Sequence, residues 1–234
     1  MSPRSEFLAG VRFQLPILLG VIPFGVIYGV LGIGAGLSPE LAQAMSSVVF
    51  AGSAQFIGAQ MIKEASPALV IVLTTFVVNL RHMLYAASVQ PYIQHLSTRW
   101  KWGLAYLLTD EAYATVIVHY QRGGELKHKH WFYLGAGLTL WASWQSSTLV
   151  GVVFGSAAQI PAAWGLDFTL ALTFIGIVFT SLKDRPTAAA ALSAGAVAVL
   201  GAGLQYKLGL MLAALVGITV GVILEESKAV KSKQ

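Results

Sequence analysis

The chain has 234 residues, of which 56% are hydrophobic and only 11% are charged, and its formal net charge is +5. Soluble domains carry roughly 25% charged residues, so this composition excludes an ordinary soluble protein and indicates an integral membrane protein. Cysteine is absent, which excludes a disulfide framework and any site that needs a thiolate.

Eight apolar segments follow one another, each near the roughly 20 residues that a helix needs to cross a bilayer. They cover residues 13–36, 41–62, 67–90, 103–120, 131–154, 166–182, 187–204 and 208–224. The ten-residue alternation typical of a transmembrane β-barrel does not dominate the sequence. We therefore predict an all-α fold, a polytopic transmembrane helical bundle with 7–8 spans. One transmembrane domain covers residues 1–224, and a basic tail follows at 225–234.

The second segment, 41–62, is the least regular of the eight because Ser, Gln and Gly interrupt it. Gly52, Ser53 and Gln55 predict a broken helix near 51–55, whose free backbone groups could bind a ligand. Hydrogen bonding between helices is the alternative use of these polar residues. The segment either crosses the bilayer, which gives eight spans, or is re-entrant, which gives seven.

The third and fourth segments carry polar residues near their middle. Asn79, Arg81 and His82 interrupt the third segment, and Asp110 and Glu111 interrupt the fourth. Antiparallel spans place residues equally distant from their connecting loop at the same depth, which sets Arg81 level with about residue 112. Because charge inside a membrane is costly, we expect Arg81 to pair with Asp110 or Glu111, with Asp110 preferred.

One guanidinium against two carboxylates leaves this region with excess negative charge, which a proton, a cation or a substrate ammonium group could balance. We assign proton coupling to Glu111, with His82 as a second candidate, because both side chains can exchange protons when their surroundings change. The alternatives are a structural ion pair between Arg81 and Asp110 and a packing role for His82.

The fifth segment places Trp141 and Trp144 at the same depth, through the loop near residue 126. Trp144 is a candidate wall of an apolar pocket, together with Phe50 and Phe56. The predicted binding residues are therefore Gly52, Ser53, Gln55, Asn79, Arg81, Asp110 and Trp144.

Internal similarity suggests an inverted repeat at an offset of 104 residues. "VVFAGSAQ" at 48–55 aligns with "VVFGSAAQ" at 152–159, and Arg81 aligns with Arg185. Such repeats are common in secondary transporters. Glycine pairs four residues apart predict close helix packing: Gly25 and Gly29, Gly151 and Gly155, and Gly217 and Gly221.

The distribution of Lys and Arg indicates the orientation. With eight spans, eleven of the fifteen basic residues lie on the side of both termini, whereas Arg99, Lys101 and Lys207 lie on the other side. The positive-inside rule then places both termini in the cytoplasm.

The sequence contains no nucleotide-binding loop and no nucleophile elbow, and we predict neither enzymatic activity nor a metal or cofactor site. A secondary-active transporter fits best. The alternatives are a passive channel for a small polar solute, which would need polarity across the full thickness, and a non-transporting membrane scaffold.

Four motifs, "FAGSAQF" (50–56), "NLRHMLYA" (79–86), "TDEAYA" (109–114) and "WGLDF" (164–168), resemble the AzlC family of bacterial branched-chain amino acid exporters. The resemblance implies a multi-pass permease of the bacterial cytoplasmic membrane that exports leucine, isoleucine, valine and sometimes methionine, driven by protons. It also implies a small second membrane subunit of the AzlD type. Nucleic acid is not an expected partner.

Overall fold

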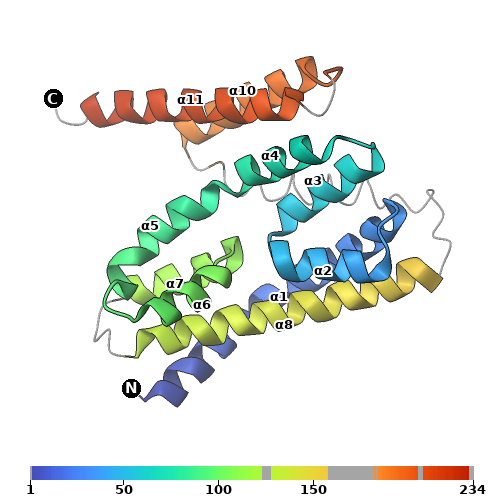
Figure 1. Cartoon of the computed structure of the whole chain (residues 1–234). Helices are drawn as coiled ribbons and strands as arrows, with labels where there is room; N and C mark the ends of the chain where they lie inside the picture. Colours follow the sequence, from blue (N-terminus) through green and yellow to red (C-terminus); the bar gives the residue numbers. More distant parts are fainter. Residues whose placement is uncertain (1, 123–127, 158–181, 183, 205–207, 232–234) are drawn as a thin grey trace. The chain divides into compact units, whose positions relative to one another are not determined.

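A computed structural model describes residues 2–122, 128–157, 182, 184–204 and 208–231. These residues are mostly helical and include no strand, so the predicted all-α fold class is confirmed. The chain divides into two compact units (Figure 1). Unit 1 consists of Met1–Glu64 and Ile71–Ile160, and unit 2 of Ala65–Val70 and Pro161–Gln234. The prediction of one transmembrane domain at 1–224 and a tail at 225–234 stays a prediction.

The helices of unit 1 are α1 (Pro3–Gly34), α2 (Pro39–Val49), α3 (Gly52–Lys63), α4 (Ala68–Asn79), α5 (Arg81–Ile93), α6 (Thr98–Tyr106), α7 (Asp110–Gln121) and α8 (Lys129–Ala157). The first turn of α4 belongs to unit 2. Unit 2 further contains α10 (Arg185–Leu200) and α11 (Leu208–Lys231). The predicted span 166–182 lies outside the described residues, apart from Leu182, and the "WGLDF" motif lies wholly outside them.

Helices α1 and α8 form the central pair of unit 1 and run parallel (Figure 1). The N-terminal halves of the two helices contact each other, and so do their C-terminal halves. A Cβ added to Gly10 would lie 2.9 Å from the backbone nitrogen of Ala136, and one added to Gly29 would lie 2.4 Å from the carbonyl oxygen of Thr148. Only glycine permits this approach, so the predicted packing role of the first two glycine pairs is confirmed.

Helices α2 and α3 form a hairpin rather than one straight helix. The chain turns at Phe50, which adopts the left-handed conformation with φ 40°. This conformation is unfavourable for a bulky residue, and burial of the Phe50 ring offsets the strain. The two arms then run side by side, because Gly58 of α3 faces Met45 of α2. The predicted break therefore exists, at residues 50–51.

Helices α6 and α7 form a second hairpin, which points the opposite way along α8. At the start of α6, the Trp100 ring lies 5.1 Å from that of Trp131, and after its end Leu107 faces Gly137. Helix α7 then returns, so that the Tyr120 hydroxyl donates to the carbonyl of Lys129 at 3.3 Å.

The expectation that residues 103–120 form a single crossing helix is therefore wrong. Thr109 begins a new helix inside the segment, because its side chain accepts a hydrogen bond from the backbone N–H of Ala112 at 3.3 Å. Two short arms replace the span, and each would be about 14 to 18 Å long, half of a bilayer core.

Helices α4 and α5 run in succession past both hairpins with a turn at Leu80. Thr75 of α4 faces Gly58 of the α2/α3 hairpin, whereas the Tyr92 ring of α5 lies 5.0 Å from that of Tyr120 at the far end of α7. This pair of helices therefore extends along the full length of unit 1.

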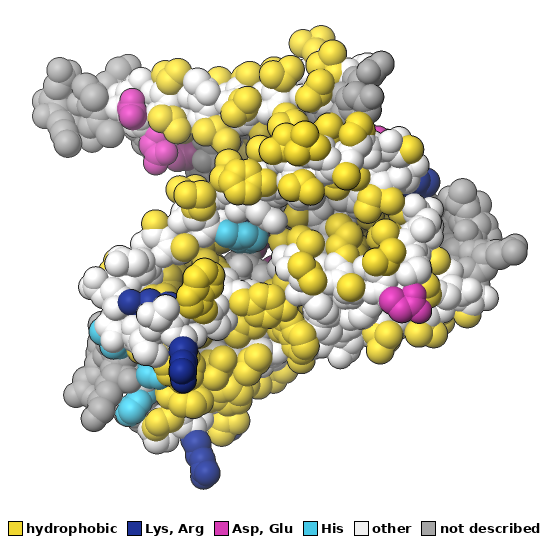
Figure 2. Space-filling view, in the orientation of Figure 1, with side chains coloured by type: hydrophobic (Ala, Val, Ile, Leu, Met, Phe, Trp, Pro, Cys, Tyr) yellow, Lys and Arg dark blue, Asp and Glu magenta, His cyan; other side chains and the backbone are white. Residues whose placement is uncertain are grey.

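Three described helical stretches are long and apolar enough to cross a membrane: Pro3–Gly34, Ala68–Ile93 and Leu208–Ser227. Hydrophobic side chains cover much of the visible surface (Figure 2), and Leu19 and Leu84 are 81% and 73% exposed. Such exposure is costly in water but ordinary in lipid. In unit 2, α10 and α11 pack closely where Gly217 faces Ala190 and Ala194, which confirms the third glycine pair as a packing site.

Candidate functional site

Three chain interruptions meet near the middle of α8. The tips of the two hairpins touch, because the Phe50 and Tyr106 ring centroids are 5.8 Å apart and the Tyr106 hydroxyl donates to the carbonyl of Ser47 at 2.7 Å. The turn at Leu80 lies against both tips, because Arg81 contacts residues that follow each of them. Helices α2, α4 and α6 therefore end at this place, and α3, α5 and α7 begin there.

Arg81 connects the three interruptions. Its Nη2 atom lies 2.9 Å from Oδ2 of Asp110 and donates a hydrogen bond to Oγ of Ser53 at 3.0 Å. The predicted ion pair between Arg81 and Asp110 is therefore present. Their side chains are 30% and 36% exposed, so the pair is accessible from the surface of the isolated chain.

Tyr85 adds a second donor to Asp110. Its hydroxyl donates to Oδ1 at 2.7 Å, so each carboxylate oxygen of Asp110 has its own partner. The Tyr85 ring stacks on the Tyr113 ring at a centroid distance of 4.5 Å, and the Tyr113 hydroxyl donates to Ser88 Oγ at 3.0 Å. We call Ser53, Arg81, Tyr85 and Asp110 the polar cluster.

Three polar atoms in and next to Arg81 are buried without a partner. Within the described part of the chain, Oδ1 of Asn79, Nε of Arg81 and Nε2 of His82 have no hydrogen-bond partner. Burial of such atoms without partners costs free energy, and each one calls for an explanation such as a bound water, an ion or a functional role. Asn79 and His82, both predicted site residues, therefore each carry one such atom.

Glu111 does not share the ion pair of its neighbour. Among the described residues, Arg81 pairs with Asp110, and no ion pair joins it to Glu111. Neighbouring residues on a helix point about 100° apart, which is consistent with this separation.

The remaining predicted residues form a second group behind the α2/α3 turn. The Trp144 indole donates to Oε1 of Gln55 at 3.1 Å, and a Cβ added to Gly52 would lie 3.2 Å from the same indole. Phe50 and Phe56 are also buried, at 5% and 4% exposure. The structure therefore brings Gly52, Gln55 and Trp144 together as packing around the turn, without direct contact to Arg81.

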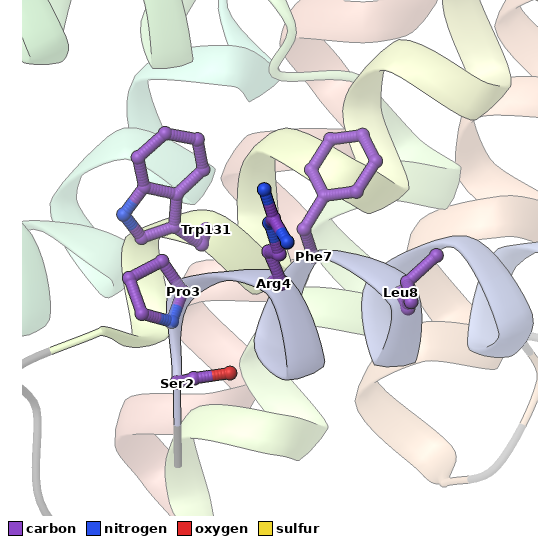
Figure 3. Close-up of a pocket in the computed structure, with 6 residues that line it drawn as sticks. All are labelled: Ser2, Pro3, Arg4, Phe7, Leu8 and Trp131. Atoms are coloured by element: carbon purple, nitrogen blue, oxygen red, sulfur yellow. The ribbon is translucent and has the colours of Figure 1, made fainter.

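A cavity of about 770 Å³ lies elsewhere, at the start of α1. It is lined by Ser2, Pro3, Arg4, Phe7, Leu8 and Trp131 (Figure 3). Trp131 contacts Trp100 at the start of α6, so this cavity lies near the base of the α6/α7 hairpin, well away from its tip. Among the described residues, no group of three His, Cys, Asp or Glu could hold a metal ion.

Two features of the site were missed at the level of sequence. The α6/α7 turn has a local signal, since Thr109 followed by Asp110 and Glu111 is typical of a helix start. Tyr85 has a weaker one, because it lies four residues after Arg81 and therefore on the same face of α5.

The fold and the cluster define an all-α membrane protein whose helices are interrupted around an ion pair. The sequence model described as AzlC protein matches residues 16–158, which cover most of unit 1, and the chain belongs to this family.

Several curated relatives support this assignment. The chain is 27% identical over 187 residues to the inner membrane protein YgaZ of Escherichia coli, covering 77% of this chain and 75% of YgaZ. It is 28% identical over 229 residues to the branched-chain amino acid transport protein AzlC of Bacillus subtilis, covering 94% and 88%. It is also 29% identical over 220 residues to a membrane protein of Archaeoglobus fulgidus, covering 93% and 94%. No solved structure matches the chain significantly.

Proposed function

We propose that this chain exports branched-chain amino acids across the bacterial cytoplasmic membrane by a secondary-active mechanism. The observation that carries the proposal is the polar cluster at the meeting point of three helix interruptions. The name of the Bacillus subtilis relative supports the substrate class. Leucine, isoleucine and valine are the primary candidates, and methionine is a further one.

The cluster offers complementary groups to the two charged ends of an amino acid. Arg81 can bind the substrate carboxylate, and the uncapped start of α3 at Gly52 and Ser53 adds backbone N–H groups to the same region. Asp110 can bind the substrate ammonium group once Arg81 is engaged. Asn79 supplies a free amide oxygen beside them.

Gly52 and Gln55 have an indirect role in this proposal. The bond between Trp144 and Gln55 fixes the α2/α3 turn and so holds Ser53 toward Arg81. Phe50 and Trp144 supply the apolar surface nearest to the turn, where a branched side chain would bind.

Opposed hairpins support an alternating-access mechanism. One hairpin approaches the cluster along the second half of α8 and the other along the first half, so movement of either tip would open the cluster to one side only. Glu111 and His82 are the proposed proton-coupling residues, because Glu111 follows Asp110 in the first turn of α7 and His82 follows Arg81 in the first turn of α5. Neither a passive channel nor a scaffold requires this arrangement.

We further propose that α1 and the α4 and α5 pair cross the membrane, whereas both hairpins are re-entrant from opposite sides. Helix α8 is not among the three most apolar stretches, but we propose that it also crosses, because its 29 residues pack parallel to α1 along its length. Seven of the nine Lys and Arg residues up to Lys129 then lie on the side of the N-terminus, with Lys63 opposite and Arg81 at the middle. The positive-inside rule makes that side cytoplasmic. Arg99 and Lys101 thereby move to the cytoplasmic side, which strengthens the charge bias.

Counterflow in proteoliposomes tests the proposed function. Vesicles loaded with unlabelled leucine should accumulate labelled leucine, isoleucine and valine, but not lysine or glutamate. The assay should be run with and without a small AzlD-type subunit, which we propose as a partner. Equal leakage of all solutes would indicate a channel, and no uptake under either condition would reject transport.

A further inference from the structure

Asp110 is held by two independent donors. Arg81 Nη2 lies 2.9 Å from Oδ2, and the Tyr85 hydroxyl donates to Oδ1 at 2.7 Å. Hydrogen bonds to a charged group are roughly twice as strong as neutral ones, so either donor contributes substantially to the position of the carboxylate. The two contacts can also change separately, because each uses a different oxygen.

The position of the Tyr85 hydroxyl does not depend on Arg81. The Tyr85 ring is half-buried and stacks on Tyr113 with an interplanar angle of 13°. The Tyr113 hydroxyl donates separately to Ser88, one turn further along α5 than Tyr85, so the ring stack itself does not use that hydroxyl. This stack joins α5 to α7 directly beside Asp110, so it would remain when the guanidinium moves.

We propose that Tyr85 is a positioning residue that retains Asp110 at the site when Arg81 binds the substrate carboxylate. The inference rests on the proposed function. A substrate carboxylate competes with Oδ2 of Asp110 for the guanidinium, and that oxygen is released. Because Tyr85 still holds Oδ1, the released oxygen remains in place and accepts a hydrogen bond from the substrate ammonium group.

This arrangement makes recognition of the amino group depend on Tyr85. A ligand with a carboxylate but no ammonium group, such as 4-methylpentanoate, displaces Asp110 from Arg81 and provides no hydrogen-bond donor to the released oxygen. Leucine pairs with both Arg81 and Asp110. Tyr85 should therefore contribute to the preference for leucine over 4-methylpentanoate, and its removal should reduce that preference.

The test compares Tyr85→Phe with Tyr113→Phe in leucine counterflow. Both changes keep the stacked rings and remove one hydroxyl, but only the first hydroxyl contacts Asp110. We expect Tyr85→Phe to raise the KM for leucine about tenfold, as for the loss of a hydrogen bond to a charged group, with the saturating rate little changed. Tyr113→Phe should leave KM near the wild-type value. In an Asp110→Ala background, which removes the acceptor, Tyr85→Phe should have no further effect on leucine binding.

Inhibition of leucine uptake by 4-methylpentanoate gives the second measurement. Its inhibition constant should be similar in wild type and Tyr85→Phe, so the preference for leucine falls by the same factor as KM rises. An unchanged KM in Tyr85→Phe overturns the inference, as does equal impairment of both variants. A lower melting temperature in Tyr85→Phe than in Tyr113→Phe, with equal losses for both ligands, would assign Tyr85 a structural role and also overturn it. Inactive wild-type protein would instead reject the proposed function, and this inference with it.

Discussion

Arg81 contacts Ser53 and Asp110 through the same nitrogen, Nη2. Its positive charge has two candidate roles. Arg81 could stabilise the fold by pairing with Asp110, or it could bind substrate. Removing one member of an ion pair leaves the other charge without compensation, whereas removing both does not. Paired substitutions can therefore separate the two roles.

We predict that Arg81→Ala and Asp110→Ala each lower the melting temperature, and that the double variant recovers most of this loss. The double variant should nevertheless fail in leucine counterflow, because the group that binds the substrate carboxylate is gone. Fluorescence-monitored melting and counterflow on the same preparations provide the measurements. Recovery of transport in the double variant would show that the pair is only structural.

Glu111 does not take part in the ion pair between Arg81 and Asp110, so proton coupling can be tested separately from binding. We predict that Glu111→Gln retains leucine counterflow, which needs no net proton movement, but loses leucine accumulation driven by an imposed proton gradient. Glu40→Gln, an exposed change at the start of α2, is the control and should retain both activities. If Glu111→Gln still accumulates leucine against its gradient, His82 becomes the stronger candidate.

Among the helices, α1 and α8 depend on backbone contact at glycine positions. A Cβ at Gly29 would lie 2.4 Å from the carbonyl oxygen of Thr148 and 2.6 Å from the nitrogen of Val152. Backbone atoms cannot move aside as a side chain can, so the helices would have to separate.

We therefore predict that Gly29→Ala destabilises the chain by about 1 to 3 kcal/mol, the usual cost of overpacking. Gly20→Ala is a matched control on the same helix, because nothing lies within 4 Å of its added Cβ. It should be neutral or slightly stabilising, since alanine favours a helix over glycine. Thermal melting in detergent compares the two variants, and equal melting temperatures would contradict the close contact.

For the whole molecule, the proposed re-entrance of the two hairpins would change the membrane topology. A single crossing by residues 103–120 would place the loop near residue 96 outside the cell, whereas a re-entrant α6/α7 hairpin would place it in the cytoplasm. The chain contains no cysteine, so each introduced cysteine can be labelled without background.

We predict that Gln94→Cys is protected from a membrane-impermeant maleimide in intact cells and reacts in inverted vesicles. Glu40→Cys should show the opposite pattern, because it lies in the first turn of α2, at the other end of α1. Both positions are exposed in the structure, so low reactivity would reflect sidedness rather than burial. Labelling of Gln94→Cys in intact cells would support the topology with eight crossings.

The sequence alone determined that this protein lies in a membrane and that its fold is all-α. Lipid requires long apolar helices, and the 11% of charged residues leaves no other fold class plausible. The depth comparison also predicted the pairing of Arg81 with Asp110, although it assumed a single crossing helix where the chain folds back. The motifs independently identified the family.

Only the tertiary structure showed whether residues 103–120 form one long helix or two short arms. An apolar segment of about 20 residues has the same composition whether it crosses once or folds back as two half-length arms, so hydropathy could not distinguish them. Packing decides, because Trp100 lies beside Trp131 and Leu107 beside Gly137, contacts that a crossing helix could not make. Tyr85 became visible for the same reason: its bond to Asp110 joins residues 25 apart in sequence, which no local pattern specifies.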